Sequence, residues 1–324
     1  MNCGYLFIVL ATVFFSSMEV ALKTVAADFH PMQLNCTRFL IGGLLLIPFA
    51  LRGLRQHGAT LTLSAWKGFS GLGFLGLVVS MMFYQVSILY APASVVSVLF
   101  SCNPVLVLPF AFLILHADIR PAHIAALVVE VAAALVIIDP VHTSLAPTGI
   151  ILVLLSAATF ALYAVLGKKQ CAEFSGVAVT CFSCLAASVQ MIALMLISHL
   201  PFVADALAAA GASSFANIPF FSGYRPDNIL NVLYICVFVT AGGYACYFMG
   251  MEATSAMQGS LVFFFKPVLA PILAMVVLGE QVPWNMWAGI ALMLTASIIS
   301  MLPTWQALMA ARPFLAQRLL HRRH

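Results

Sequence analysis

Apolar runs about as long as a membrane is thick alternate with short polar segments along most of the 324-residue chain. A helix that crosses the hydrocarbon core needs about 20 mainly apolar residues and satisfies its own backbone hydrogen bonds there. The pattern therefore predicts an all-α polytopic membrane protein with ten transmembrane helices. The predicted spans are residues 4–26, 32–51, 68–89, 93–115, 122–138, 148–167, 177–199, 229–251, 258–278 and 284–302.

The second part of the chain repeats the first. Residues 84–138 align without a gap with residues 247–301 at an offset of 163 (267 minus 104), which places Pro104 on Pro267. The sixth span aligns with the first at an offset of 145 (168 minus 23). Because five spans is an odd number, the second repeat must be inverted in the membrane. We predict two inverted five-helix repeats, residues 1–140 and 141–303, and a basic cytoplasmic tail at residues 304–324.

Composition and charge agree with a membrane location. The chain is 63% hydrophobic and 7% charged, whereas a soluble domain has about 25% charged residues. With the N-terminus inside, one outside segment holds Arg225 and three cations lie within spans. The inside segments hold Arg52, Arg55, Lys67, Arg120, Lys168, Lys169, Arg312, Arg318, Arg322 and Arg323. The positive-inside rule then predicts a plasma (inner) membrane protein with both termini in the cytoplasm.

A lysine stands near the middle of the ninth span. An unpaired charge at the bilayer centre costs roughly 2.5–3.5 kcal/mol, and Pro267 directly follows Lys266. Proline has no N–H and crowds the carbonyl four residues earlier, so we expect the helix to be kinked or broken there. The matching position in the first repeat is Asn103, before Pro104. Charge and paired helix breakers together predict a cavity at the membrane midplane.

Other ionisable residues lie within spans, and each has more than one interpretation. Glu19 and Lys23 are four residues apart, so they could pair on one helix face, or Glu19 could line the cavity as a substrate or proton contact. Arg38 could form an ion pair with Asp28 or with Glu19. Glu130 could be neutral, pair with Lys266 or lie at an oligomer contact, and an intramembrane carboxylate is by default a functional candidate. Glu19 and Glu130 are the candidate proton-coupling residues.

Motifs for cofactors or metals are absent from the sequence. A G-x-G-x-x-G pattern at residues 71–76 lies inside an apolar helix, where glycines let helices approach closely. Cys181 and Cys184 have no second ligand pair at metal spacing, and there is no Walker A sequence. We expect no metal, no cofactor and no nucleic-acid partner. The segment at residues 201–228 could rest on the membrane or cap the cavity.

These features together resemble the EamA-type family of the drug/metabolite transporter superfamily, over nearly the whole chain. The matching motifs are the small-residue turn at 253–256, the sequence at 266–271 that leads to residues 278–280, and the starts of the second repeat at 161–163 and 167–169. The resemblance implies transport of small metabolites, often amino acids, through a central cavity between the repeats. It also implies that the fifth and tenth spans pack outside that cavity.

We therefore expect a secondary transporter, an exporter of amino acids or organic acids that works by alternating access. The expected cavity residues are Lys266, Glu19, Asn103, Tyr163, Tyr84 and Tyr247. The alternatives are a non-transporting membrane scaffold or receptor and a membrane-embedded enzyme. The sequence contains no H-E-x-x-H motif, so we predict that the protein is not an enzyme. Substrate identity, transport direction, coupling ion and oligomeric state stay open.

Overall fold

The computed structural model describes residues 3–117, 121–139, 146–209, 212–259 and 261–299, and these residues form helices and connecting segments without a strand. Within these described ranges, eight helical stretches are long and apolar enough to cross a membrane: Cys3–Val25, Pro31–His57, Leu63–Tyr90, Ala93–Leu115, Pro121–Ile138, Pro147–Gln170, Gly176–Ser198 and Ile229–Ala253. Two shorter apolar helices, Phe265–Leu278 and Trp284–Ile299, coincide with the ninth and tenth predicted spans. The expected tail at 304–324 lies outside the described residues.

Several of these stretches are divided into shorter helices. The first half contains α1 (Cys3–Ser16), α2 (Met18–Val25), α3 (Pro31–His57), α4 (Leu63–Leu72), η1 (Gly73–Ser80), α5 (Met81–Tyr90), α6 (Ala93–Phe100), α7 (Asn103–Leu115) and α8 (Pro121–Ile138). The second half contains α9 (Pro147–Gln170), α10 (Gly176–Ser198), α11 (Pro201–Ala209), η2 (Ser213–Phe215), α12 (Ile229–Tyr234), η3 (Ile235–Tyr244), α13 (Ala245–Ala253), α14 (Ala256–Gly259) and α15 (Val262–Leu278).

The expected helix break at a proline occurs in one half and not in the other. Helix α6 ends at Phe100, and Pro104 stands in the first turn of α7, where its missing N–H is not needed. Of the kink or break expected at Pro267, the break is wrong, because α15 begins at Val262 and continues through that proline, and the kink stays a prediction. Ser101 also donates its hydroxyl to the Ser97 carbonyl at 2.7 Å, a bond of the kind that often bends helices. The matching position, 264, has a phenylalanine without a hydroxyl group.

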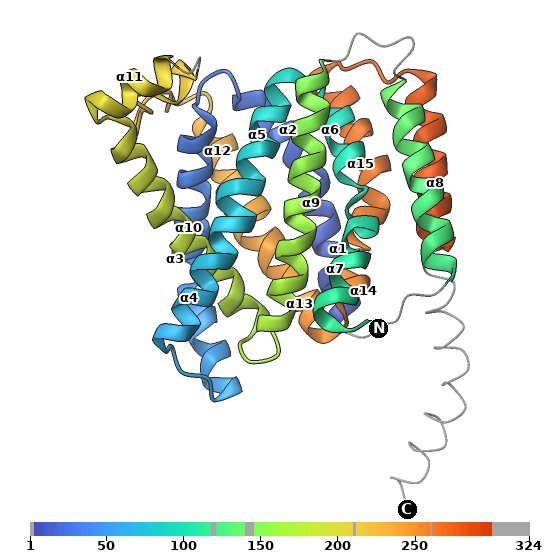
Figure 1. Ribbon diagram of the computed structural model, residues 1–324, viewed down its shortest axis with the longest axis horizontal. Coiled ribbons are helices and arrows are strands. Elements are labelled where there is room, and N and C mark those ends of the chain that lie inside the picture. Colours follow the sequence, from blue (N-terminus) through green and yellow to red (C-terminus); the bar gives the residue numbers. More distant parts are fainter. Residues whose placement is uncertain (1–2, 118–120, 140–145, 210–211, 260, 300–324) are drawn as a thin grey trace, which may run out of the picture.

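The helices pack in corresponding pairs (Figure 1). Helix α1 contacts α13 and α15, whereas α9 contacts α5 and α7. Helix α3 lies along α10. Helix α8 and the helix at 284–299 stand together at one edge of the bundle, joined by Asn285, whose amide donates to the Val136 and Ile137 carbonyls at 3.3 Å. This edge position agrees with the expectation that the fifth and tenth spans lie outside a central site.

Two π-helical segments, η1 and η3, occupy corresponding positions. Adding 163 to the first residue of η1, Gly73, gives 236, one residue after the start of η3. Both segments are approached closely by aromatic rings. A Cβ atom on Gly76 would lie 2.2 Å from the Tyr163 ring, and one on Gly243 would lie 2.7 Å from Phe15. The interpretation of the glycines at 71–76 as close-packing positions is therefore confirmed for Gly73 and Gly76, whereas it is wrong for Gly71, where an added Cβ would meet nothing within 4 Å.

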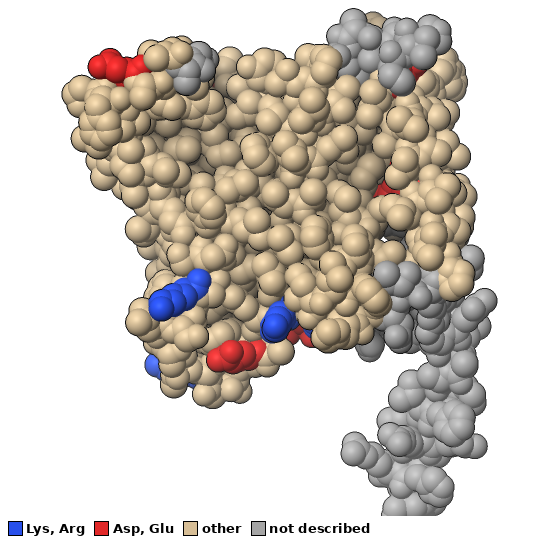
Figure 2. Space-filling view, in the orientation of Figure 1, with Lys and Arg blue, Asp and Glu red and all other residues tan. Residues whose placement is uncertain are grey.

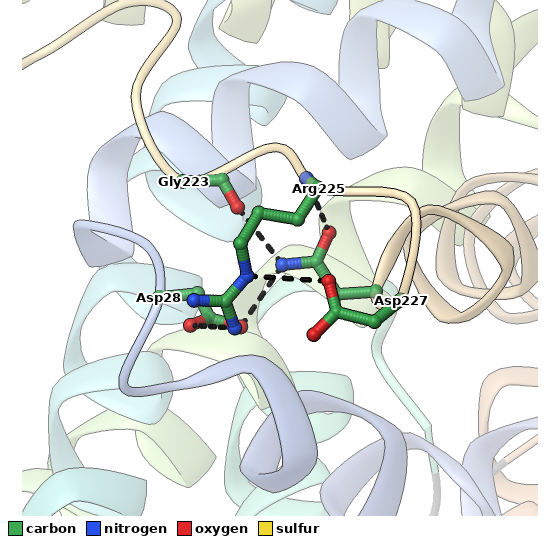
Figure 3. Close-up of polar contacts among 5 residues, drawn as sticks. Asp28, Gly223, Arg225 and Asp227 are labelled. Carbon is green, nitrogen blue, oxygen red and sulfur yellow. Dashed lines mark hydrogen bonds and ion pairs between the residues drawn. The ribbon is translucent and has the colours of Figure 1, made fainter.

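The connection between α11 and α12 covers the beginning of α3. Gln33 donates its amide to the carbonyls of Phe220 at 3.2 Å and Ser222 at 2.7 Å. Arg225 contacts Asp28 at 2.8 Å, and the side chain of Asn228 donates to the other Asp28 oxygen at 2.9 Å (Figure 3). This segment is therefore attached by polar contacts to the α2–α3 connection.

The surface is apolar over most of its height. Figure 2 shows Lys and Arg side chains gathered at the lower end of this face, around α4 and the end of α9, and a middle zone with almost no charge. Large apolar side chains are exposed on the outer helices, such as Val128 and Leu135 of α8. A surface of this kind is suited to contact with lipid tails.

Candidate functional site

A salt bridge lies in the core between the two halves of the chain. The Lys266 Nζ of α15 is 2.5 Å from the Glu19 Oε1 of α2, and both side chains are fully buried. The Tyr84 hydroxyl of α5 donates a hydrogen bond to the same Glu19 oxygen. The second carboxylate oxygen, Oε2, has no hydrogen-bond partner among the described residues. Three different helices thus bring two charges and a phenol to one point.

Aromatic rings surround the lysine. The Lys266 Nζ lies 4.7 Å from the centre of the Phe100 ring, 5.6 Å from that of Tyr84 and 5.7 Å from that of Phe263. The negative faces of aromatic rings attract a cation, which offsets part of its lost hydration. Phe100 and Phe263 are at matching positions in the two repeats, at the offset of 163 (263 minus 100). They are not among the cavity residues expected from the sequence, although their identity at matching positions was a usable signal.

The pairing of Glu19 with Lys23 is wrong. Lys23 Nζ donates instead to the carbonyls of Ile88 at 2.5 Å and Ala91 at 3.1 Å, at the end of α5. Glu19 points toward Lys266, so the alternative that placed Glu19 in the central site is the one that the geometry favours. The i, i+4 spacing allows Glu19 and Lys23 to meet on one helix face, but it does not show whether Glu19 pairs with Lys23 or with Lys266.

The other candidates lie near the centre with different contacts. Asn103 donates its amide to the Ala157 carbonyl of α9 at 3.0 Å, and its own carbonyl oxygen is without a hydrogen bond in the described part of the chain. Tyr163 and Tyr247 are fully buried, and their hydroxyl groups also lack partners within the described residues. Their rings belong to one aromatic cluster with Phe160 and Phe248. Unsatisfied buried polar atoms of this kind require an explanation.

Glu130 does not pair with Lys266, which is engaged by Glu19. Glu130 lies on α8 and is 4% exposed. Its carboxyl group is within electrostatic range of Cys102, in the turn between α6 and α7. It is therefore near the helix break rather than beside the central lysine.

Arg38 is the buried charge that the sequence analysis assigned incorrectly. It was expected to pair with Asp28 or Glu19, but Asp28 binds Arg225 and Glu19 binds Lys266. The Arg38 Nη1 is 3.7 Å from the Met18 sulfur, and its guanidinium carbon is 4.6 Å from the centre of the Phe39 ring. Nε and Nη2 have no hydrogen-bond partner among the described residues.

A cleft of about 490 Å³ lies between α2, α12 and α15. Its polar lining includes Ser17, Thr24, Asn231 and Tyr234, and its apolar lining includes Leu273. The hydroxyl groups of Ser17 and Tyr234 are 2.7 Å apart across it. Neither Glu19 nor Lys266 is among the residues that line this cleft.

Among the described residues, no group of three or more His, Cys, Asp or Glu side chains is placed to hold a metal ion. The eight cysteines are free. Six of them are buried, Cys246 is half-buried and Cys3 is exposed.

Comparison with known proteins gives consistent results. The sequence model of the EamA-like transporter family matches residues 2–139 and 147–302. An uncharacterized transporter of Clostridium kluyveri is 32% identical over 308 residues, which cover 93% of each chain. An uncharacterized transporter of Archaeoglobus fulgidus is 22% identical over 293 residues, or 90% of this chain and 95% of that one. One crystal structure superposes with a TM-score of 0.68 at 19% identity, covering 94% of this chain and 98% of the other, which shows a shared fold.

Proposed function

The chain belongs to the EamA-like transporter family, and from this premise we propose that it is a secondary transporter that exports amino acids or organic acids by alternating access. The buried Glu19–Lys266 pair carries this proposal. Glu19 comes from the first half of the chain and Lys266 from the second, so the pair links the two parts that must move relative to each other. A substrate that separates these charges would thereby couple its own binding to that movement.

The chemistry of the pair favours a charged substrate. A substrate carboxylate can replace Glu19 at Lys266, and a substrate ammonium can replace Lys266 at Glu19. Tyr84 can keep donating to whichever carboxylate remains. Because breaking a buried ion pair without replacement costs several kcal/mol, a neutral metabolite would compete poorly. Asn103, Tyr163 and Tyr247 would supply hydrogen bonds to the polar parts of the substrate.

The proposed architecture is two inverted five-helix repeats, residues 1–140 and 141–303, with a cytoplasmic tail at 304–324. The corresponding helix pairs of α1 and α9 and the matching positions of η1 and η3 support it. Ten cations lie in the proposed inside segments and Arg225 alone in an outside one, which supports cytoplasmic termini in a plasma (inner) membrane. Pro104 and Pro267 would then be weak points of different kinds in two central helices, with a helix break before Pro104 and a missing backbone N–H at Pro267 inside α15.

Proton coupling is the proposed energy source. Glu19 would take up a proton when Lys266 transfers to a substrate carboxylate, which avoids leaving an unpaired buried charge. Glu130 is the second candidate, at the turn between α6 and α7.

Flux in proteoliposomes tests the proposal. Purified protein would be reconstituted and offered labelled L-amino acids and small mono- and dicarboxylic acids, with and without a pH gradient, beside protein-free liposomes. We expect counterflow of one class of compound and a response to the gradient. No flux for the whole panel would contradict the substrate class and would favour a scaffold or receptor role. Chemical conversion of a panel compound would instead favour a membrane-embedded enzyme.

A further inference from the structure

Arg38 is fully buried in α3 and has one unused edge. Its Nη1 faces the Met18 sulfur at 3.7 Å, a weak contact, and its guanidinium lies over the Phe39 ring at 4.6 Å. The remaining nitrogens, Nε and Nη2, are buried and without a hydrogen-bond partner in the described part of the chain. These two atoms form the side of a guanidinium that binds a carboxylate through two parallel hydrogen bonds.

Four carboxylates near the helix ends and in the core are engaged elsewhere. Glu19 binds Lys266, Asp28 binds Arg225 and Asn228 (Figure 3), and Glu280 accepts from the backbone N–H groups of Ala93 and Ser94. Glu252 accepts from the Gly176 N–H and contacts His57. None of these described acids serves as a counter-charge for Arg38.

The surroundings of Arg38 contain further unused polar atoms. Its guanidinium lies within electrostatic range of the Tyr244 and Tyr84 hydroxyl groups. The Tyr244 hydroxyl is buried and has no hydrogen-bond partner among the described residues, whereas the Tyr84 hydroxyl reaches Glu19. Tyr84 therefore stands between the arginine and the Glu19–Lys266 pair. Arg38 and the pair are parts of one polar centre.

The internal repeat does not explain why an arginine stands at position 38. The offset of 145 that relates the first spans of the two halves also relates the starts of α3 and α10 (176 minus 31). It places Arg38 on Ser183, a small neutral residue. The helix packing thus forms in the second half without a charge at this position.

We propose that Arg38 is the carboxylate-binding group of the transport site, with its free Nε–Nη2 edge holding a small carboxylate and the Tyr244 hydroxyl donating a further hydrogen bond. The inference rests on the proposed transport function and narrows it. The substrate carries a carboxylate at one end, and its other end lies toward Glu19 and Lys266. An α-amino acid fits, with its ammonium group toward Glu19, and so does an organic acid with a second anionic group toward Lys266.

The first test compares acids with their carboxamides. Counterflow would be measured for L-amino acids and small mono- and dicarboxylic acids, each beside its amide, in wild type, Arg38→Met and Arg38→Lys. We expect wild type to prefer the acid, and Arg38→Met to lose roughly tenfold to hundredfold in apparent affinity for the acid while gaining nothing for the amide. Arg38→Lys should retain part of the preference, since it keeps the charge without the two-pronged edge. An unchanged acid preference in Arg38→Met overturns the inference.

A second measurement decides the role of Arg38 even if no compound is transported. An arginine that waits for a substrate is an uncompensated buried charge, so Arg38→Met should raise the melting temperature of the substrate-free protein by roughly 2–8 °C. Lys23→Met is the matched control, because Lys23 is already bound to two carbonyl oxygens and its loss should lower stability. A lower melting temperature for Arg38→Met would show a structural arginine and overturn the inference. Absent flux with a stabilised Arg38→Met would contradict the proposed amino-acid or organic-acid substrate class instead.

Discussion

Lys23 and Lys168 make the same contact at opposite ends of the helix bundle. Lys23 Nζ binds the carbonyls of Ile88 and Ala91 at the end of α5, and Lys168 Nζ binds those of Met251 at 2.5 Å and Thr254 at 3.2 Å at the end of α13. The lysines are related by the offset of 145 (168 minus 23), and their carbonyl partners by 163 (251 minus 88). Figure 1 places α2 and α5 toward the upper end and α13 at the lower end.

The charged residues at the centre of the molecule, in contrast, are not repeated in the two halves. Glu19, Arg38 and Lys266 correspond by the same offsets to Ala164, Ser183 and Asn103. The two halves therefore share the contacts that hold helix ends and differ in the residues that carry charge in the core. A duplicated scaffold needs both copies of its end contacts, whereas one substrate needs one copy of each binding group.

The largest effect should follow from breaking the central pair. Lys266→Ala leaves Glu19 buried without a counter-charge, which costs about 3–5 kcal/mol and removes a proposed substrate contact. We expect an inserted but less stable protein with no measurable flux. Thermal unfolding in detergent and proteoliposome flux check both parts. Near-normal flux in this variant would remove Lys266 from the site.

Close packing at the π-helical segments should give the next effect. Gly76→Ala would place a Cβ atom 2.2 Å from the Tyr163 ring, and Gly243→Ala would place one 2.7 Å from Phe15. Overpacking of this kind costs about 1–3 kcal/mol, and we expect Gly76→Ala to cost more. Gly71→Ala is the control, because its Cβ would meet nothing within 4 Å. Equal melting temperatures for all three variants would contradict the packing described.

The contacts of Lys23 and Lys168 should contribute similar free energies of folding at opposite ends of the helix bundle. Lys23→Met and Lys168→Met each remove charged hydrogen bonds to carbonyl oxygens, which are worth about 1.5–3 kcal/mol. Hydrogen exchange should rise around residues 88–94 in the first variant and around 251–257 in the second. Increased exchange in the same segment for both variants would show that the contacts are not independent.

The smallest effect concerns the caps of α3 and α10, which again correspond at the offset of 145 (175 minus 30). His30 accepts the Met32 N–H through Nδ1 at 3.2 Å, which requires a neutral ring, and burial lowers the pKa of His30 below 6.5. A lowered folded-state pKa means that this stability is complete above pH 6.5 and is lost as the pH falls through the folded value. We expect a loss of up to about 1 kcal/mol.

Melting temperatures between pH 5 and pH 7.5 check this expectation. His30→Asn keeps a capping side chain without a titrating ring, so its curve should be flatter than that of the wild type. The cap of α10, Ser175, does not titrate in this range. A wild-type curve as flat as that of His30→Asn would contradict the role of His30.

Hydropathy predicted the positions of the helices because the length of an apolar run is a local property. It did not predict the break at Ser17 or the π-helical segments, which depend on hydrogen bonds and close contacts with other helices. The break expected at Pro267 failed for the same reason, since a lost hydrogen bond inside a packed helix can be tolerated. The sequence also identified Glu19 and Lys266 as exceptional residues.

The pairing of Glu19 with Lys266 could not be predicted from the sequence, because 247 positions (266 minus 19) separate the two residues and Lys23 was a nearer partner for Glu19. Arg38 was assigned to a carboxylate on the general expectation that buried charges are paired. Its missing partner is visible only once the contacts of Asp28 and Glu19 are known.

A double variant tests the central claim that the Glu19–Lys266 pair serves transport rather than stability. Replacing a buried ion pair by neutral side chains of similar size is often neutral or stabilising. Glu19→Gln combined with Lys266→Met should therefore melt no lower than the wild type and carry no amino acid or organic acid in proteoliposomes. A double variant with near-normal flux would contradict the account.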